Sequence, residues 1–124
     1  MARIMIVDDA LFMRQMLGKI LTGEGHEICA EAANAKDAVE QYKKCRPELV
    51  TMDIVMPLME ELDGIGAVKE ILQLDPQAKI LLISAMSQQP IVVEAILLGA
   101  KDFLSKPVNP ERLKETVKNI LTAL

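Results

Sequence analysis

The sequence predicts an α/β fold in which a doubly wound, five-stranded parallel sheet is covered by five helices. Short apolar runs alternate with amphipathic segments along the chain, which is typical of repeated strand–helix units. Three of the apolar runs are continuous, as expected for strands that are buried on both faces. With 51% apolar residues among 124, the chain can form the core of one domain spanning 1–124.

In the first half of the chain, glycine and proline separate the predicted elements. Gly23 and Gly25 close the first helix, and Pro47 follows the second because proline cannot continue a helix. The elements expected here are a strand at 4–7, a helix at 10–21, a strand at 27–32, a helix at 35–44 and a strand at 48–52.

The second half of the chain continues the alternation. Pro76 lies just beyond the third helix and Gly99 just beyond the fourth, while Asn109 caps the fifth and Pro110 takes its first position. The expected elements are a helix at 65–73, a strand at 79–83, a helix at 89–98, a strand at 101–105 and a helix at 110–121.

The second strand, at 27–32, is the most polar of the five and belongs at an edge of the sheet. The flavodoxin-like strand order 2-1-3-4-5 places it there. In that order the ligand site lies outside the carboxyl ends of the first and third strands, where the strand order reverses.

Composition excludes several function classes. Fourteen basic and eighteen acidic residues give a net charge of −4, the wrong sign for a general nucleic-acid binder, and three aromatic residues cannot form stacking platforms. The apolar stretches fall far short of the roughly 18 residues of a membrane span, and the N-terminus does not resemble a signal peptide. Cys29 and Cys45 have no metal-ligand spacing, so we expect free thiols and a cytoplasmic protein.

Polar side chains end four of the five apolar runs. Asp8 and Asp9 follow the first strand and Asp53 follows the third, while Ser84 ends the fourth and Lys106 the fifth. Because neighbouring parallel strands end at one edge about 4.8 Å apart, these side chains should meet. Each residue alone is as well explained by a turn, a loop hydroxyl or a solvated charge, and only their convergence favours a site.

The chemistry of this cluster favours a divalent cation. Three carboxylates repel one another, and Lys106 compensates only one of the charges. Oxygen-only ligands favour Mg²⁺ over zinc. Carboxylates, Mg²⁺, a hydroxyl and a lysine together suit phosphoryl transfer, with Asp53 as the nucleophile that forms an acyl phosphate and with Ser84 and Lys106 holding the phosphoryl oxygens.

Five short motifs carry a family resemblance along the whole chain. They are IVDDA at 6–10, MDIVMP at 52–57, DG at 63–64, ISAM at 83–86 and GAKDFLSKP at 99–107. On these motifs the sequence resembles the receiver domain of two-component response regulators. The stretch DDALFMR at 8–14, without an output domain after the receiver, resembles the stand-alone chemotaxis type of this family, CheY.

The resemblance implies a phosphorylation site and a metal site. Asp53 would be phosphorylated by a histidine kinase of the CheA type. Mg²⁺ would be held by Asp9, Asp53 and the backbone carbonyl of Val55, with Asp8 acting through water.

The resemblance also implies roles for the last two strands. Ser84 and Lys106 would contact the phosphate, the Lys106–Pro107 bond would be cis, and Phe103 would change rotamer with phosphorylation. From the residues alone, Phe103 is only a core aromatic on a short strand.

The function implied is a signalling switch that relays chemotaxis signals to a flagellar or archaellar motor. It is not an enzyme beyond its own phosphotransfer and autodephosphorylation. Its partners would be the kinase, a motor-switch or adaptor protein and a phosphatase, with no nucleic acid or membrane, and we expect a monomer. The alternative is a single-domain phosphorelay intermediate or phosphate sink with a non-motor target. A flavin or serine-hydrolase enzyme is disfavoured because the first loop is anionic and residues 82–86 (LISAM) lack the nucleophile motif.

Two segments depart from a plain receiver pattern. The loop Leu58–Leu62 holds three more residues than the family pattern, either as a tolerated insertion or with Glu60 and Glu61 in contact with a partner.

The helix at 89–98 is unusually apolar, and the expected orientation leaves part of it as a docking patch. Four residues should face the sheet, namely Val92, Ala95, Ile96 and Gly99. The expected partner surface consists of Ile91, Glu94 and Leu98 on the outward side, with Leu97 flanking.

Overall fold

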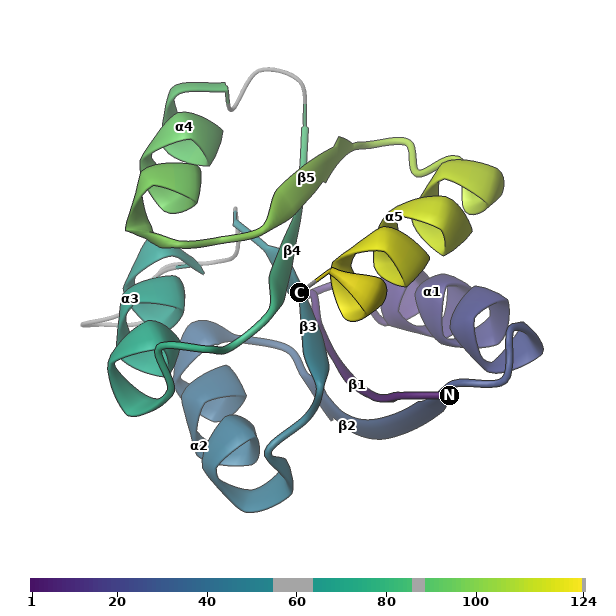
Figure 1. Cartoon of the computed structure of the whole chain (residues 1–124), viewed down its shortest axis with the longest axis horizontal. Helices are drawn as coiled ribbons and strands as arrows, with labels where there is room; N and C mark the ends of the chain where they lie inside the picture. The colour runs from purple at the N-terminus through teal and green to yellow at the C-terminus, as the bar shows by residue number, and fades with distance from the viewer. Residues whose placement is uncertain (55–63, 86–88, 124) are drawn as a thin grey trace.

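The computed structural model contains a parallel five-stranded sheet between two layers of helices (Figure 1). The structure describes residues 1–54, 64–85 and 89–123. The elements are β1 (Arg3–Val7), α1 (Leu11–Gly23), β2 (Glu27–Ala32), α2 (Ala35–Cys45), β3 (Leu49–Asp53), α3 (Gly64–Leu74), β4 (Ile80–Ser84), α4 (Gln89–Leu98), β5 (Asp102–Ser105) and α5 (Pro110–Thr122).

The strand order is β2-β1-β3-β4-β5, and every neighbouring pair is parallel. Helices α2, α3 and α4 cover one face of the sheet, and α1 and α5 cover the other (Figure 1). The predicted fold class, strand order and polar edge strand are therefore confirmed. Element bounds differ from the expected ones only at their ends, where capping and fraying decide the last residue.

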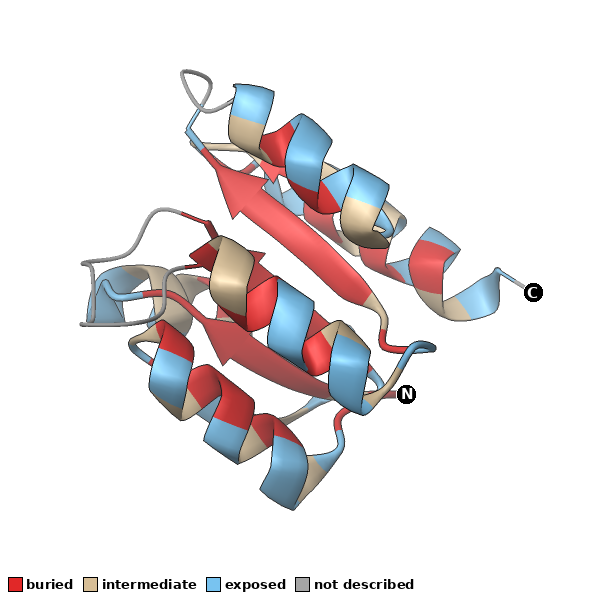
Figure 2. Cartoon of the chain, turned by 90° about the vertical axis from the view of Figure 1, so that its left-hand side faces the viewer, coloured by how far each residue is buried: buried red, intermediate tan, exposed pale blue. Residues whose placement is uncertain are grey.

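The core has two halves, one on each face of the sheet. Strands β1, β3 and β4 are buried almost throughout, while the helices bury one side and expose the other (Figure 2). Alternation along each strand sends successive side chains to opposite halves: Met5 and Val7 lie in the half under α2 and α3, and Ile4 and Ile6 lie under α1 and α5.

Local residue chemistry explains where the helices start and stop. The Asn109 side chain accepts hydrogen bonds from the backbone N–H groups of Glu111 (2.9 Å) and Arg112 (3.1 Å), and Pro110 occupies the first position of α5. Gly99 ends α4 with φ +129°, a backbone angle that L side chains rarely adopt. The predicted cap of the last helix and the glycine stop of the fourth are both confirmed.

Helix α4 is rotated relative to the orientation expected from its sequence. Val92 and Ala95 are buried as predicted, but Ile96 is 37% exposed, so its predicted inward position is wrong. Figure 2 shows the alternating buried and exposed stripes of the helices. The side of α4 that faces the core includes Ile91, Ala95 and Leu98, which are spaced four and three residues apart. Ala95 is buried, and Ile91 and Leu98 are half-buried.

The outward side of α4 therefore has a different composition from the expected one. Ile91 packs against the core, so its predicted outward position is wrong, and Leu98 is half-buried rather than fully outward. Among the large apolar residues of α4, the most exposed are Leu97 (82%) and Val93 (55%), which are one helical turn apart and lie beside the exposed Glu94.

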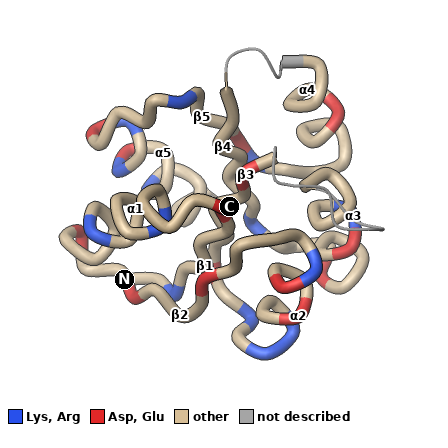
Figure 3. Tube along the Cα trace, turned by 180° about the vertical axis from the view of Figure 1, so that it is seen from behind, with Lys and Arg blue, Asp and Glu red and all other residues tan. Residues whose placement is uncertain are grey.

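Acidic and basic positions are interspersed along the helices (Figure 3). In the described part of the chain, no helix combines the length and the apolar character that crossing a membrane requires. Cys29 and Cys45 are free thiols, as predicted.

Candidate functional site

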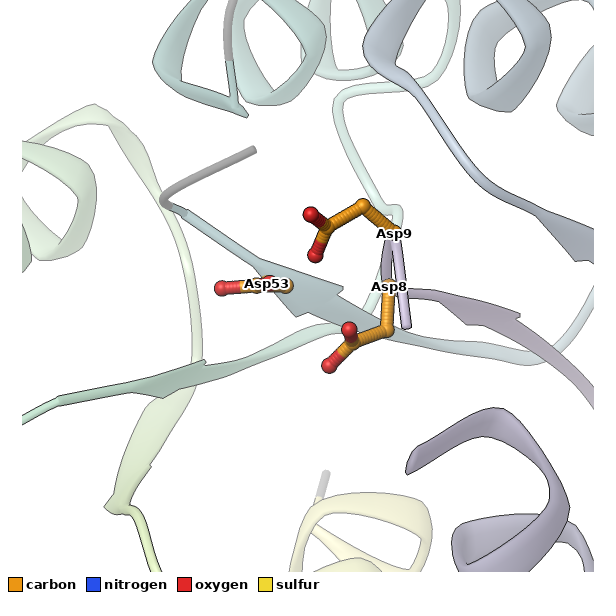
Figure 4. Close-up of side chains that lie close together, drawn as sticks. All are labelled: Asp8, Asp9 and Asp53. Carbon is orange, nitrogen blue, oxygen red and sulfur yellow. The ribbon is translucent and has the colours of Figure 1, made fainter. Parts of the chain in front are cut away.

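Three aspartates meet at the carboxyl end of the sheet. One carboxylate oxygen from each of Asp8, Asp9 and Asp53 lies within 4.8 Å of the others. Figure 4 shows Asp8 and Asp9 following β1 and Asp53 at the end of β3, with the three side chains gathered in one place. Asp8 and Asp53 are almost fully buried, at 1% and 3% exposed, while Asp9 is exposed. The predicted clustering at the point where strand order reverses is confirmed.

Asp8 is held from three directions. Its Oδ1 accepts a hydrogen bond from the Ala10 N–H at 2.9 Å, and its Oδ2 accepts one from Lys106 Nζ at 3.2 Å. Its backbone carbonyl accepts from Arg14 Nη1 at 2.7 Å. These contacts orient a buried carboxylate toward the centre of the cluster, because two of them use the carboxylate itself.

Lys106 is the cation of the cluster. Its Nζ lies 3.2 Å from Asp8 Oδ2 and 3.4 Å from Asp53 Oδ2, so it bridges the two buried carboxylates. Burial alone would lower the pKa of the Lys106 ammonium, but the charges of Asp53 and Asp8 outweigh this effect and raise the pKa above its usual value. Lys106 therefore stays protonated over the physiological range.

The backbone around Lys106 positions this ammonium. The backbone N–H of Lys106 donates a hydrogen bond to the Ser84 carbonyl at 2.8 Å, which connects the end of β5 to the end of β4. The Lys106–Pro107 peptide bond is cis, as the family resemblance implied.

The residues present fit a hard divalent cation. Among the described residues, three carboxylates lie beside the Lys106 ammonium, and the nearby Arg14 is already paired with Glu31 at 3.0 Å. Buried like charges of this kind repel unless a cation lies among them. Every donor in the cluster is oxygen, which suits Mg²⁺ better than a thiophilic metal. Val55, whose carbonyl completes the expected ligand set, lies outside the described residues, as does the loop Leu58–Leu62 with Glu60 and Glu61.

Ser84 and Phe103 lie on the strands beside this cluster. Ser84 is 2% exposed at the end of β4 and pairs in register with Ser105 of β5. Phe103 is half-buried on β5 and packs against the core half under α2, α3 and α4. It also lines a surface hollow of about 340 Å³ together with Pro107 and Arg112. Ser84 therefore lies at the same edge of the sheet as the aspartates, and Phe103 borders a surface hollow.

The structure adds two residues that the sequence did not single out for a role. Arg14 contacts the Asp8 carbonyl, and the sequence pointed to this residue only through its place at the end of the motif DDALFMR at 8–14. Gly64 begins α3 so close to β3 that an added Cβ would lie 2.7 Å from Ile54 Cα. Only glycine lets α3 begin this near the end of the strand that carries Asp53. His26, the single histidine, lies away from the site, where its Nδ1 accepts from the Ala2 N–H at 3.1 Å.

Comparisons with known proteins identify the family of this chain. The model of the response regulator receiver domain family matches residues 4–118. The chain belongs to this family. It is 52% identical over 118 residues to the chemotaxis protein CheY of Thermotoga maritima, covering 95% of this chain and 96% of that protein. It is 54% identical over 119 residues to CheY of Bacillus subtilis, covering 96% of this chain and 97% of that protein.

A solved structure supports the assignment at the level of the fold. A chain in the crystal structure of the CheX–CheY–BeF₃–Mg²⁺ complex from Borrelia burgdorferi is 32% identical and superposes with a TM-score of 0.90. The match covers 98% of this chain and 90% of that one. This receiver domain is therefore CheY-like in sequence and in fold, and it is a chemotaxis response regulator.

Proposed function

We propose that this receiver domain accepts a phosphoryl group on Asp53 from a histidine kinase of the CheA type and relays the signal to a flagellar or archaellar motor. The observation that carries the proposal is the cluster of Asp8, Asp9 and Asp53 with Lys106 at one edge of the sheet. The high identity to CheY proteins over nearly their whole length supports the chemotaxis role. The proposal includes a receiver domain over 1–124 that works as a monomer in the cytoplasm.

In the proposed phosphotransfer, an Asp53 carboxylate oxygen attacks phosphorus of a phosphohistidine. The new O–P bond forms an acyl phosphate while the N–P bond breaks, and the electron pair of that bond stays with the departing imidazole. Lys106 Nζ, 3.4 Å from Asp53 Oδ2, neutralises a phosphoryl oxygen, and the Ser84 hydroxyl would donate to another. Asp9, Asp53 and the Val55 carbonyl would hold Mg²⁺, with Asp8 acting through water, and the bound ion would offset the negative charge on the phosphoryl oxygens.

The proposed switch follows from the positions of Ser84 and Phe103. A phosphoryl group on Asp53 would draw the Ser84 hydroxyl toward it, and Phe103 would then turn inward from its half-buried position beside the surface hollow. This local change would alter the surface of α4, β5 and α5 that a partner meets.

We propose α4 as part of the surface that a motor-switch or adaptor protein recognises. The proposed contact residues are Glu94, Leu97 and the half-buried Leu98, while Ile91 is left out because it packs against the core. Val93 joins them because it is exposed one turn before Leu97. A phosphatase is a further proposed partner, in line with the CheX–CheY complex of the Borrelia relative.

The test is a comparison of partner capture with and without beryllofluoride, a mimic of the phosphorylated aspartate. We expect a motor component to bind the beryllofluoride-treated chain, and Asp53→Asn to remove the difference between the two states. Leu97→Glu should weaken capture while phosphorylation of Asp53 from a small-molecule phosphodonor continues. If the phosphorylated chain instead passes its phosphoryl group to a second histidine, or binds no motor component, the phosphorelay or phosphate-sink alternative replaces the proposal.

A further inference from the structure

A pair of cysteines, Cys29 and Cys45, lies away from the aspartates, between the edge strand β2 and the last turn of α2. Cys45 Sγ donates a hydrogen bond to the backbone carbonyl of Cys29 at 3.3 Å, so the Cys45 sulfur lies against the Cys29 backbone. Both residues are half-buried, so small reagents can reach them. The two cysteines are 16 positions apart in sequence, and the fold brings them together.

A β-bulge explains why Cys29 lies beside α2. In the pairing of β1 with β2, Ile4 pairs with Ile28 and Met5 pairs with Ala30, so Cys29 is the extra residue of β2. In a regular strand, Ile28 and Ala30 would face the same side. Here Ile28 packs on the core half under α1 and α5, and Ala30 packs on the opposite half. The bulge re-aims the strand at Cys29 and leaves this residue beside the end of α2.

Arg3 holds the other half of the pair in place. Its Nη2 donates to the Cys45 carbonyl at 2.7 Å and its Nη1 to the Arg46 carbonyl at 3.3 Å. These bonds satisfy carbonyls at the end of α2 and keep Cys45 next to β2. Burial and the neighbouring Cys45 raise the pKa of the Cys29 thiol, an effect that the charge of Arg3 partly opposes.

We propose that Cys29 and Cys45 form a reversible intramolecular disulfide by exchange with a small-molecule disulfide of the glutathione type. One cysteine thiolate attacks a sulfur of the reagent, forming a mixed disulfide and releasing one reagent thiolate. The second cysteine thiolate then attacks the protein-bound sulfur of that mixed disulfide and releases the second reagent thiolate. The two cysteines lose two protons and two electrons, and the reagent disulfide is reduced to two thiols. The cross-link joins α2 to the edge strand β2 and lies outside the aspartate site.

The first test incubates the native chain with glutathione disulfide, quenches with acid and measures the intact mass. We expect the chain to lose the mass of two hydrogen atoms while remaining a monomer, with one linked peptide pair containing Cys29 and Cys45. Cys29→Ser and Cys45→Ser should each stop at a stable glutathione adduct. Persistent adducts on the unsubstituted chain, or a disulfide between two copies of the chain, would overturn the proposal.

The second test compares folded and urea-unfolded chains in buffers of reduced and oxidised glutathione. Because the fold brings the thiols together, the equilibrium constant for the intramolecular disulfide should be larger in the folded chain by about a hundredfold, which corresponds to the stabilisation typical of a loop of this length. A ratio below about tenfold would overturn the proposal, since the pair would then gain little from the fold. The rate of exchange should rise with pH above neutrality, because the thiolate is the nucleophile and the pKa of Cys29 is raised.

Discussion

The two ends of the sheet differ in how their charged and polar groups are paired. At the carboxyl end, the carboxylates of Asp8, Asp9 and Asp53 lie beside the Lys106 ammonium, which bears one positive charge against their three negative charges. At the other end, Arg3 satisfies carbonyls of α2, and the Tyr42 hydroxyl donates to Asp75 at 2.9 Å. A divalent cation would offset the charge at the first end, whereas the polar groups named at the second end are paired with one another. Function is concentrated where folding alone leaves the electrostatics unbalanced.

Gly64→Ala tests how tightly the carboxyl end is built and should have the largest effect on stability. An added Cβ would lie 2.7 Å from Ile54 Cα, and the atoms that it meets are backbone atoms of Ile54, which cannot move aside as a flexible side chain can. We expect a loss of about 3 kcal/mol in the free energy of unfolding, measured by urea denaturation.

Gly18→Ala is the matched control for this prediction. A Cβ at Gly18 in α1 would meet only Ile6 Cδ1 at 3.8 Å and Ile28 Cγ1 at 3.9 Å, which are ordinary contacts. This variant should be stabilised by roughly 0.5–1 kcal/mol, because alanine favours the helix. Equal effects of the two substitutions would contradict the close approach at Gly64.

At the amino end of the sheet, Tyr42 should cause a loss of stability at alkaline pH. Burial and the hydrogen bond to Asp75 raise the pKa of Tyr42 to about 12, and this side chain is only 1% exposed. Because the pKa of Tyr42 is higher in the folded chain, protonated Tyr42 stabilises the fold fully below the tyrosine pKa of the unfolded chain, near 10. This stabilisation is lost as pH rises toward 12. We expect unfolding free energy to fall by about 2 kcal/mol across that window.

Tyr42→Phe is the control for the alkaline window. Phenylalanine keeps the buried ring but has no proton to lose, so the variant should be less stable at neutral pH and lack the loss between pH 10 and 12. Parallel pH profiles for the two chains would show that another group is responsible.

Asp53→Asn tests the repulsion between the carboxylates at the carboxyl end of the sheet. Removing one of three crowded charges should raise the unfolding free energy by about 1 kcal/mol in the absence of divalent cations. Mg²⁺ should raise the melting temperature of the unsubstituted chain and have little effect on the variant. The exposed Asp102, on β5, provides Asp102→Asn as a control that should keep the Mg²⁺ response.

Thr51→Val examines the middle of the sheet and should have the smallest effect. Thr51 is fully buried on β3, and among the described residues its Oγ1 has no hydrogen-bond partner. Replacing the hydroxyl with a methyl group should therefore stabilise the chain by up to about 1 kcal/mol in urea denaturation. A destabilised Thr51→Val variant would mean that the hydroxyl is satisfied in solution.

The amino-acid pattern alone determined the order of the elements, the polar edge strand and the group of residues at the carboxyl end. This was possible because buried parallel strands are continuous apolar runs, and residues that follow such runs must share one edge. Asp8, Asp53 and Lys106 could therefore be placed together although Lys106 is 98 positions from Asp8.

Only the tertiary structure decided features that depend on how segments approach one another. The orientation of α4 follows from its packing on the core, and an almost uniformly apolar helix such as 89–98 has no clear polar side to indicate it. The approach of Gly64 to Ile54 and the bulge that brings Cys29 to Cys45 depend on distances between separate elements. Periodicity reports which side of one element is apolar, and it contains no information on the exact spacing between two elements.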